Sequence, residues 1–425
     1  MKYGLLYYKN TDNIGDDIQT YAQLRFLPKV DYLIDREKLG MFIPQKKELV
    51  SVIMNAWYMH NEIAWPPSPY INPLPISMHF TSNDRLKKNA SCYLGLGAEY
   101  LKNISPIGGR DYETLNRLKK QKINCYFSGC MTLTIKPFDN IKKDNYICAV
   151  DIDNDILEKI KNSTDKKVVT FTHTVDPEKY GKLSIDTRMK KVEDILKKYQ
   201  KASLVITSRL HVMLPCLAIG TPVIYVYPDN YEKDRIDSFL KYVKHVSKTD
   251  FLTKNISEIL NNPIDNNSFI EIRNNLEKKC NDFIESKTIN ISSSLPEINE
   301  YKKIVELKEY YYDLYENCRK SSLNNILDAD RYYKMLQDYL EKYENNRNNI
   351  DYLNNEIGVL TKTIDCIRSD LKKSDDKYEL LKNDYLKLNS RYNKFMKFSL
   401  IGLLRRIYRL RYSFKANRGK STQSK

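Results

Sequence analysis

Residues 204–224 read LVITSRLHVMLPCLAIGTPVI, and they form the clearest local pattern in the chain. A short β-branched run ends at Thr207, and an apolar segment typical of a buried helix begins at Val212. A second β-branched run follows the Gly-Thr-Pro turn at 220–222. Continuous apolar strands that are joined through a helix are typical of a buried parallel sheet. The segment therefore predicts an α/β fold.

The same alternation of apolar runs and amphipathic segments continues through roughly the first 265 residues. It predicts strands at 3–8, 32–35, 50–57, 92–97, 124–127, 145–150, 167–172, 204–207 and 222–226. It predicts helices at 16–27, 111–120, 155–161, 185–201, 212–219 and 234–242. Residues 136–144 contain Pro137 and few apolar side chains, which is typical of a linker. The sequence thus predicts two Rossmann-like domains, at 1–135 and 145–290, with a site in the cleft between them.

The composition indicates a globular body with a separate basic end. The 425 residues are 41% apolar and 29% charged, which supplies enough apolar material for a core. Residues 385–425 hold 12 Lys or Arg and no Asp or Glu, and so carry most of the net charge of +16. Because the rest of the chain is nearly neutral, an acidic partner would be met by the C-terminal end.

The cysteine pattern and the N-terminal residues bear on the compartment. Eight cysteines are scattered without a Cys-x-x-Cys pair or a Cys/His cluster. This spacing predicts reduced, mostly buried thiols rather than a disulfide framework or a zinc site. The N-terminus lacks the apolar region and cleavage site of a signal peptide, and no run of about 18 apolar residues would span a membrane. We therefore expect a cytoplasmic protein.

Beyond about residue 300 the pattern changes to heptads, which predicts a helical coiled coil at 300–394. Glycine nearly vanishes, and apolar residues are spaced alternately three and four apart. The seam from 350 onward comprises Ile350, Leu353, Ile357, Leu360, Ile364, Ile367, Leu371, Ser374, Tyr378, Leu381, Tyr385, Leu388 and Tyr392. Such a seam predicts a homo-oligomer, most simply a dimer. The alternative is a long helix that packs on its own body.

The last segment, 395–425, combines an apolar stripe with dense positive charge. The stripe consists of Met396, Leu400, Leu403, Ile407, Leu410 and Phe414. A basic amphipathic helix of this kind is typical of peripheral contact with an anionic membrane, here at its inner face. We expect the contact to be made by Leu403, Arg405, Arg406, Ile407 and Arg409. A solvated helix, a coiled-coil extension or a tail on nucleic acid are alternatives, but large apolar residues suit lipid better, so no nucleic acid is expected as a partner.

Two polar side chains follow the strand that ends at Thr207. Arg209 and His211 lie between the end of this strand and the start of the next helix. Ligands bind at this edge of parallel sheets, and helix N-termini favour anions. A guanidinium and an imidazole there suit a phosphate or a carboxylate. The alternative is an Arg that caps a loop and a His bonded to the backbone.

Two turns in the N-terminal half could face these residues. Asn13-Ile14-Gly15-Asp16-Asp17 follows the first predicted strand and opens a helix, so its amides could approach a ligand. Asp16 could act there as a base or could simply cap the helix. Ile107-Gly108-Gly109-Arg110-Asp111 also leads from a turn into a helix and offers a second Arg.

Together these segments resemble the polysaccharide pyruvyltransferase family, and the motifs occur in family order. They are Asn-x-Gly-Asp at 13–16, Gly-x-Arg-Asp at 108–111, FSGCMTLT at 127–134, and TSRLH at 207–211 with Gly-Thr-Pro after it. The segments NAW at 55–57 and ISMHF at 76–80 look like bacterial members as well. The match covers roughly residues 1–265. Members often carry Cys or Val where Gly109 stands, but Arg110 and Asp111 are kept.

The resemblance implies a transferase of the two-domain type called GT-B, which needs no metal or cofactor. Such an enzyme moves a pyruvyl group from phosphoenolpyruvate to two hydroxyls of a bacterial surface polysaccharide, as a ketal. Arg110 and Arg209 would bind the donor anion, and His211 would act as acid or bind the leaving phosphate. Asp16 is a candidate base. The remaining candidates for substrate binding are Asn13, Gly15, Asp111, Ser208, Leu210, His79 and His173, of which the last two are alternatively buried structural histidines.

Two other functions remain open from the sequence. A glycosyltransferase that uses a nucleotide sugar could have the same architecture, with Asp151-Ile152-Asp153 as its metal-binding motif, although this segment is more simply a helix cap. A non-catalytic scaffold for glycan assembly could use the coiled coil alone. For the enzyme, the acceptor glycan could be lipid-linked.

Overall fold

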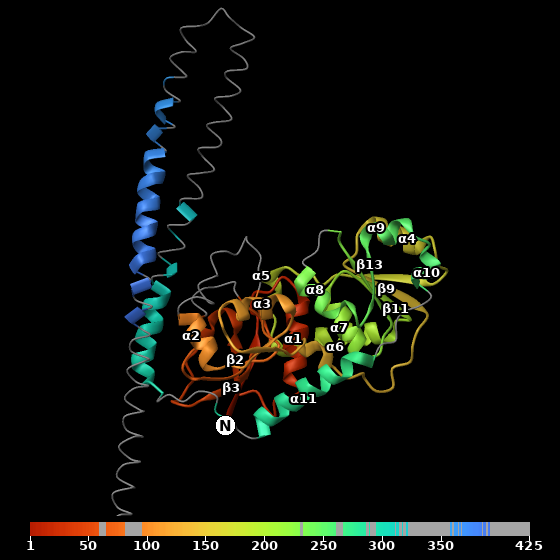
Figure 1. Cartoon of the computed structure of the whole chain (residues 1–425), viewed down its shortest axis with the longest axis horizontal. Helices are drawn as coiled ribbons and strands as arrows, with labels where there is room; N and C mark the ends of the chain where they lie inside the picture. Colours follow the sequence, from red (N-terminus) through yellow and green to blue (C-terminus); the bar gives the residue numbers. More distant parts are fainter. Residues whose placement is uncertain are drawn as a thin grey trace, which may run out of the picture. The chain divides into compact units, whose positions relative to one another are not determined.

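The computed structural model describes residues 1–58, 65–80, 96–229, 233–260, 267–285, 289 and 295–310, with short helical segments within 312–321 and 358–391. The chain divides into two compact units, Met1–Leu295 and Pro296–Lys425. The first unit holds every sheet among the described residues (Figure 1).

The N-terminal half of the first unit is built on a parallel sheet of order β2-β1-β3-β5. Its strands are β1 (Lys2–Tyr7), β2 (Tyr32–Asp35), β3 (Val50–Ile53) and β5 (Ile71–Leu74). Two parallel pairs adjoin it, β4 (Trp57–Tyr58) with β6 (His79–Phe80) and β7 (Ile107–Gly109) with β8 (Cys125–Phe127). The helices are α1 (Ile14–Leu24), η1 (Arg36–Met41), α2 (Leu96–Asn103), α3 (Tyr112–Lys120) and η4 (Met131–Thr134). Pro73 is accommodated because β5 is an edge strand.

The second half is built on a parallel sheet of order β10-β9-β11-β12-β13. Its strands are β9 (Tyr146–Val150), β10 (Lys167–Phe171), β11 (Leu204–Thr207), β12 (Val223–Tyr227) and β13 (Lys244–Ser247). Its helices are α4 (Asn154–Lys161), α5 (Pro177–Tyr180), α6 (Ile185–Lys201), α7 (Leu210–Ala218), α8 (Lys233–Leu240), α9 (Lys248–Thr253), α10 (Ile256–Leu260), η5 (Asn267–Phe269) and α11 (Ile270–Glu285). The predicted α/β class with parallel sheets is confirmed.

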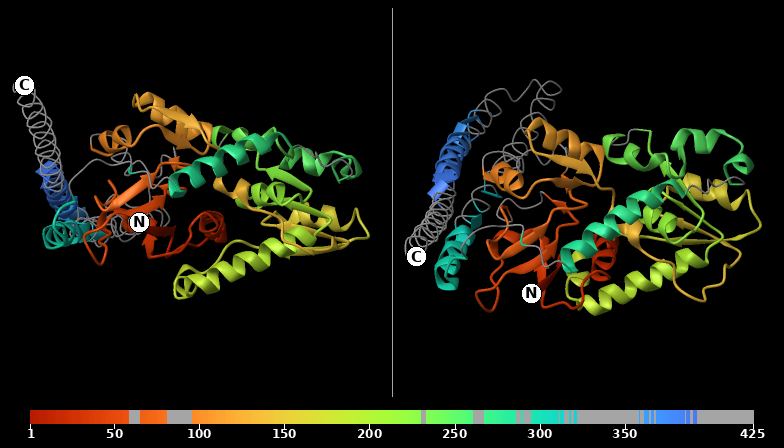
Figure 2. Two further views of the ribbon diagram at one scale, coloured as in Figure 1. Left: turned by 90° about the horizontal axis from the view of Figure 1, so that it is seen from below. Right: turned by 60° about the horizontal axis from the view of Figure 1, so that its bottom comes forward.

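One hydrophobic core joins the two halves. Ile18 of α1, Met131 of η4 and Val212 of α7 all lie in it and are fully buried. Helix α11 crosses back from the second half to the first (Figure 2), where Arg273 donates from Nε to the carbonyl of Leu133 at 2.8 Å. The starts of α1 and α7 are therefore held in a fixed relation, which matters for the site below.

Most predicted elements are present, with small shifts at their ends. The strand predicted at 92–97 is wrong at its C-terminal end, because Leu96 and Gly97 begin α2; residues 92–95 lie outside the described part. The short strands β4 to β7 and β13 were not separated or found from the pattern, since two to four residues show little periodicity. Residues 136–144 form no helix or strand, as a linker would.

The second unit is described only in its helical parts. Within 368–384 the predicted seam positions Leu371, Ser374, Tyr378 and Leu381 are half-buried, while most positions between them are exposed. The rest of the predicted coiled coil lies largely outside the described residues, and the basic segment 395–425 lies wholly outside them. None of the described helices combines the length and apolar character that a membrane span requires.

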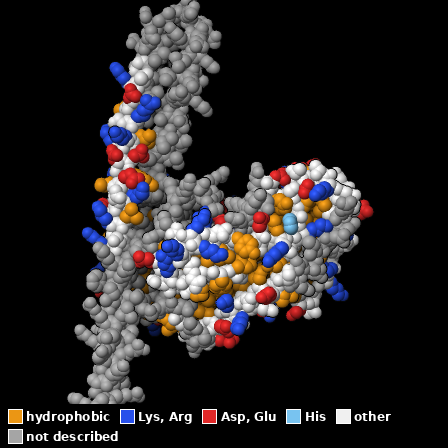
Figure 3. Space-filling model, viewed as in Figure 1, with side chains coloured by type: hydrophobic (Ala, Val, Ile, Leu, Met, Phe, Trp, Pro, Cys, Tyr) orange, Lys and Arg blue, Asp and Glu red, His pale blue; other side chains and the backbone are white. Residues whose placement is uncertain are grey.

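Charged side chains of both signs are mixed over the visible face of the first unit (Figure 3). That mixture fits the nearly neutral charge balance of residues 1–384. The described residues of this face form no single-sign patch that would draw an acidic macromolecule to the body.

Candidate functional site

The loop after β11 places an arginine and a histidine where the sequence predicts them. Strand β11 ends at Thr207, whose hydroxyl accepts the backbone N–H of Arg209 at 3.0 Å, and α7 begins at the next residue. His211 lies in the first turn of α7 and is 9% exposed. The site therefore starts at the carboxyl edge of the second sheet.

The first turn of α1 meets this histidine. A Cβ added at Gly15 would lie 3.0 Å from His211 Nδ1, so a larger residue here would crowd the imidazole. Asn13 Oδ1 accepts the N–H of Gly15 at 2.9 Å, so Asn13, not Asp16, caps the helix. The N–H of Ile14 also donates to the carbonyl of His173 at 2.9 Å, which ties the turn to the second half.

Asp16 is engaged elsewhere. Its carboxylate lies 3.2 Å from Arg36 Nη1 and accepts the hydroxyl of Thr11 at 2.7 Å. The Arg36 guanidinium in turn stacks 3.9 Å from the Tyr8 ring centroid. Both carboxylate oxygens of Asp16 are therefore engaged, Oδ1 by Arg36 and Oδ2 by Thr11, and neither is left to face a substrate hydroxyl.

A third cluster lies at the start of α3 and on β6. His79 Nδ1 is 2.6 Å from Asp111 Oδ2, and Arg110 Nε donates to the same oxygen at 3.1 Å. All three side chains are buried. Both terminal nitrogens of Arg110 and Nε2 of His79 have no hydrogen-bond partner among the described residues. A buried guanidinium with two donors to spare is suited to bind an anion.

These groups share one buried region formed by both halves. Burial lowers the pKa of His211 well below its ordinary value, and the charges of Arg110 and Arg235 lower it further. Burial lowers the pKa of His79 to about 3, and Arg110 adds to this effect while Asp111 opposes it. Both imidazoles are therefore neutral at pH 7 when no anion balances the arginines.

Arg235 is a functional candidate that the sequence did not single out. It lies on α8 of the second half, within a segment that carries no recognisable motif. Its guanidinium carbon is 5.7 Å from the ring centroid of Trp57, whose indole is in turn 6.2 Å from the His79 ring. The N–H of Tyr112 donates to Ser238 Oγ at 2.9 Å, and this bond brings α8 against α3.

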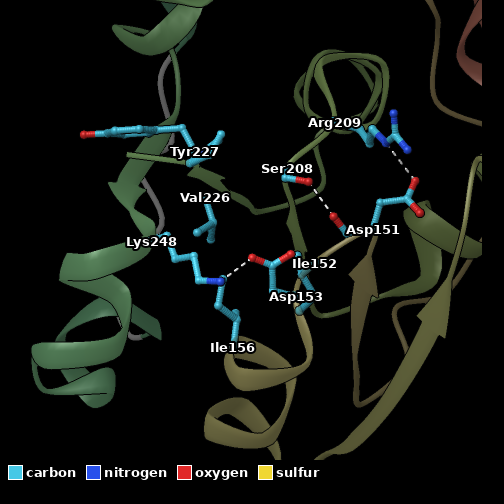
Figure 4. A pocket seen from close by; sticks show the side chains of 10 residues that line it. Asp151, Ile152, Asp153, Ile156, Ser208, Arg209, Val226, Tyr227 and Lys248 are labelled. Atoms are coloured by element: carbon cyan, nitrogen blue, oxygen red, sulfur yellow. Dashed lines mark hydrogen bonds and ion pairs between the residues drawn. The ribbon is translucent and has the colours of Figure 1, made fainter. Parts of the chain in front are cut away.

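Arg209 lines a cavity of about 240 Å³ at the ends of β9, β11 and β12 (Figure 4). Its side chain is 39% exposed, and Asp151 Oδ2 accepts its Nε at 3.0 Å. Asp151 adopts a φ of +47°, a conformation that non-glycine residues rarely take. Its carboxylate also accepts the N–H of His173 at 2.9 Å, so Asp151 links Arg209 to the loop that follows β10.

The other candidate residues have mainly structural contacts. Ser208 Oγ donates to the carbonyl of Asp151 (Figure 4), and Leu210 is 6% exposed within the core. His173 Nε2 is 2.7 Å from the hydroxyl of Tyr199, and burial lowers its pKa to about 4. Its backbone, rather than its imidazole, connects the two halves.

The carboxylates that could pose as metal ligands are paired with cations. Asp151 binds Arg209, and Asp153 Oδ2 lies 2.5 Å from Lys248 Nζ. Asp153 is at the N-cap position of α4, as the sequence indicates, but its side chain makes no hydrogen bond to the first turn of the helix. His79, Asp111 and Glu113 also converge within 4.8 Å, yet Arg110 and His79 already share Asp111 Oδ2. These donor sets suit hydrogen-bonded ion pairs better than a cation.

The comparisons with known proteins agree with this arrangement. The family model for polysaccharide pyruvyl transferase matches residues 13–230, which is just over half of the chain and includes Asn13, Arg110, Arg209 and His211. The chain belongs to the polysaccharide pyruvyl transferase family. It is therefore a transferase, of a family concerned with polysaccharides.

Solved structures show only a distant likeness. An uncharacterised protein from Klebsiella pneumoniae is 13% identical, with 57% of this chain and 87% of that chain covered and a TM-score of 0.33. The UDP-GlcNAc 2-epimerase of Methanocaldococcus jannaschii is 12% identical, with 73% and 100% covered and a TM-score of 0.34. No curated protein matches the chain.

Proposed function

We propose that this protein transfers the pyruvyl group of phosphoenolpyruvate to two hydroxyls of a sugar in a bacterial surface polysaccharide, forming a cyclic ketal. The observation that carries the proposal is the buried Arg110 guanidinium, whose two terminal nitrogens have no partner among the described residues and whose charge acts on the His211 imidazole. The two sheets, with the site between their halves, suit the GT-B type of transferase. Catalysis in this proposal uses protein groups only.

The charges of the donor fit the cations of the site. Phosphoenolpyruvate carries a carboxylate and a phosphate ester, the latter with a charge of about −1.5 to −2 at pH 7. Arg110 is buried, Arg235 is half-buried, and Arg209 is the more exposed of the three. Planar guanidinium groups bind carboxylate and phosphate oxygens in pairs, which orients the donor as well as holding it.

Donor binding would also protonate the general acid, His211. His211 is neutral in the absence of an anion, because burial lowers its pKa and the charges of Arg110 and Arg235 lower it further. A bound trianion neutralises these charges and raises the pKa of His211, so the imidazole gains a proton when the donor is present. His211 can then protonate the methylene carbon, and the resulting oxocarbenium-like C2 accepts a hydroxyl oxygen.

A nucleotide sugar as donor is the rival substrate, and a direct assay separates the two. We expect phosphate release from phosphoenolpyruvate in the presence of a p-nitrophenyl hexopyranoside panel and a chelator of divalent metals. Binding is followed separately by tryptophan fluorescence, because the chain has two tryptophans. Trp57 contacts Arg235 and His79, whereas Trp65 packs in the core against Tyr58 and Phe80.

In the Trp65→Phe variant, phosphoenolpyruvate should therefore change the emission of the remaining Trp57. The Trp57→Phe variant, which keeps the core tryptophan, is the matched control and should respond far less. Turnover of a nucleotide sugar with no response to phosphoenolpyruvate in either variant would contradict the proposed donor.

We further propose that segment 300–394 joins two copies of the chain and that segment 395–425 attaches them to the inner face of the membrane. The half-buried seam at Leu371, Ser374, Tyr378 and Leu381 supports the first part. Each Lys or Arg near anionic lipid contributes about 1 kcal/mol, and two tails in a dimer would bind together. A lipid-linked acceptor would be found at that surface.

Nested truncations test both parts. Removal of 395–425 should leave a dimer that no longer sediments with anionic vesicles, because both the apolar stripe and the positive charge of this segment are lost. Removal of 296–425 should give a monomeric α/β body. Leu403→Asp with Ile407→Asp should release the full chain from vesicles even at low salt, since insertion fails while charge remains. A body that elutes as a dimer would show that the helical segment does not join the subunits.

A further inference from the structure

We propose that His79 is the general base that takes the proton from the acceptor hydroxyl, with Asp111 as its positioning residue. This inference rests on the proposed function, because it assigns a role in that same reaction. The sequence offered Asp16 as the base and His79 only as a binding or structural residue. The contacts around Asp16 and His79 instead favour His79 as the base.

Asp111 determines which nitrogen of His79 carries a proton. Its Oδ2 lies 2.6 Å from His79 Nδ1, and its Oδ1 accepts both the N–H and the hydroxyl of Thr114, at 3.0 and 2.8 Å. The carboxylate is thus fixed by the first turn of α3 and by Arg110. Although burial alone would raise the pKa of Asp111, His79 and Arg110 hold it well below its usual value. An ionised carboxylate requires an N–H at Nδ1, which leaves a lone pair on Nε2.

The nitrogen with the lone pair is the one that no described residue engages. His79 Nε2 is buried and makes no hydrogen bond within the described part of the chain. The charged or titratable groups that act on the ring are Asp111, Arg110 and Arg235, and the ring in turn acts on His211. A base whose partner orients it, and whose ring feels the charges of the donor-binding arginines, has the arrangement that nucleophile activation requires.

Other carboxylates and imidazoles near the site are less suited. Asp16 is held by Arg36 and Thr11, and His173 directs its Nε2 to Tyr199. His211 is placed on α7 of the second half, whereas His79 lies on β6 of the first. The acid and the base therefore come from different halves. His211 can protonate the donor while His79 takes the proton of the acceptor.

The proton balance of the reaction closes with these two histidines. His79 Nε2 takes the proton of the first hydroxyl as its oxygen bonds to C2, and His211 gives a proton to C3, which becomes a methyl carbon. Phosphate leaves C2 with the electron pair of the C–O bond, and the second hydroxyl oxygen bonds to C2. Of the two hydroxyl protons, one replaces the proton that His211 gave and the other departs with phosphate, so both imidazoles return to their starting states.

The test compares His79→Gln with His245→Gln, an equal change at an exposed histidine on β13. The probe is the hexopyranoside that wild-type protein turns over fastest. We expect His79→Gln to lower kcat by about 10²- to 10⁴-fold, the usual contribution of a general base, while donor affinity measured by Trp57 fluorescence changes little. His245→Gln should match the wild type.

Three further readouts separate a base from a structural residue. The residual rate of His79→Gln should rise with pH, because water or hydroxide must take the proton. Added imidazole should restore part of the rate of His79→Ala. Asp111→Asn can still cap α3, yet it should lower kcat and shift the acid limb of its pH profile.

The outcomes distinguish this inference from the function on which it rests. Wild-type kcat and an unchanged pH profile in His79→Gln would overturn the assignment of the base alone. Absence of phosphate release by the wild-type protein would overturn the proposed function and this inference together.

Discussion

Arg110→Gln should fold normally and lose the release of phosphate from phosphoenolpyruvate. The Arg110 guanidinium is buried, donates through Nε to Asp111 at 3.1 Å, and keeps its two terminal nitrogens for an anion. Loss of a charge-assisted contact to a transition state costs about 3 kcal/mol, which is over a hundredfold in rate. Donor affinity should fall as well, because glutamine cannot replace a charged fork.

Stability should move in the opposite direction, and this separates a functional arginine from a structural one. Two donors of this buried cation lack protein partners, which is unfavourable for folding, and Asp111 keeps its contacts with His79 and Thr114 when Arg110 is removed, so Tm should be equal to or above that of the wild type. The control is Arg117→Gln on α3, the helix that begins just after Arg110; the Arg117 side chain is 30% exposed and lies 3.9 Å from Glu113. Arg117→Gln should keep its activity. Near wild-type phosphate release by Arg110→Gln would remove this residue from donor binding.

The parts of the fold that were predictable are those that local pattern determines. The β-branched run that ends at Thr207 and the apolar segment after it form β11 and α7, so the positions of Arg209 and His211 followed directly. The turn at 13–16 was likewise placed before a helix correctly, although Asn13 rather than Asp16 is the cap. Caps are hard to assign between neighbours because several polar residue types serve equally well.

The parts that escaped prediction depend on residues far apart in the chain. His79 and Asp111 are 32 positions apart and meet only because β6 and α3 pack together. Arg235 reaches Trp57 only because α8 of the second half lies against α3. Neither contact produces a recognisable pattern in the sequence. Hydrophobic periodicity indicates which face of a helix or strand is buried, but not which other element packs against that face.

The junction between the halves depends on a buried ion pair that no motif marks. Arg188 of α6 donates from Nη2 to Asp17 Oδ1 of α1 at 2.5 Å and from Nε to Oδ2 at 2.8 Å. The hydroxyl of Tyr180 donates to the same carboxylate at 2.7 Å, and Arg188 also donates to the carbonyl of Tyr8 at 2.7 Å. Both charged side chains are almost fully buried. The pair fixes α1, whose first turn places Gly15 against His211.

Asp17→Ala should therefore destabilise the first unit strongly, by about 3–5 kcal/mol, because it leaves the guanidinium of Arg188 buried without its counter-charge. Lys190→Ala, on α6 with Arg188, is the control. Lys190 is 64% exposed and lies 3.8 Å from Asp194, and an exposed pair of this kind contributes only about 0–1 kcal/mol. Asp17→Leu combined with Arg188→Met should recover much of the loss, since removing both charges leaves no unpaired ion. Urea unfolding of the four proteins measures these differences, and phosphate release under native conditions shows whether the restored junction also restores the contact of α1 with His211. Equal stability of Asp17→Ala and Lys190→Ala would mean that hydrophobic packing of α1 against α7, and not the ion pair, holds the two halves together.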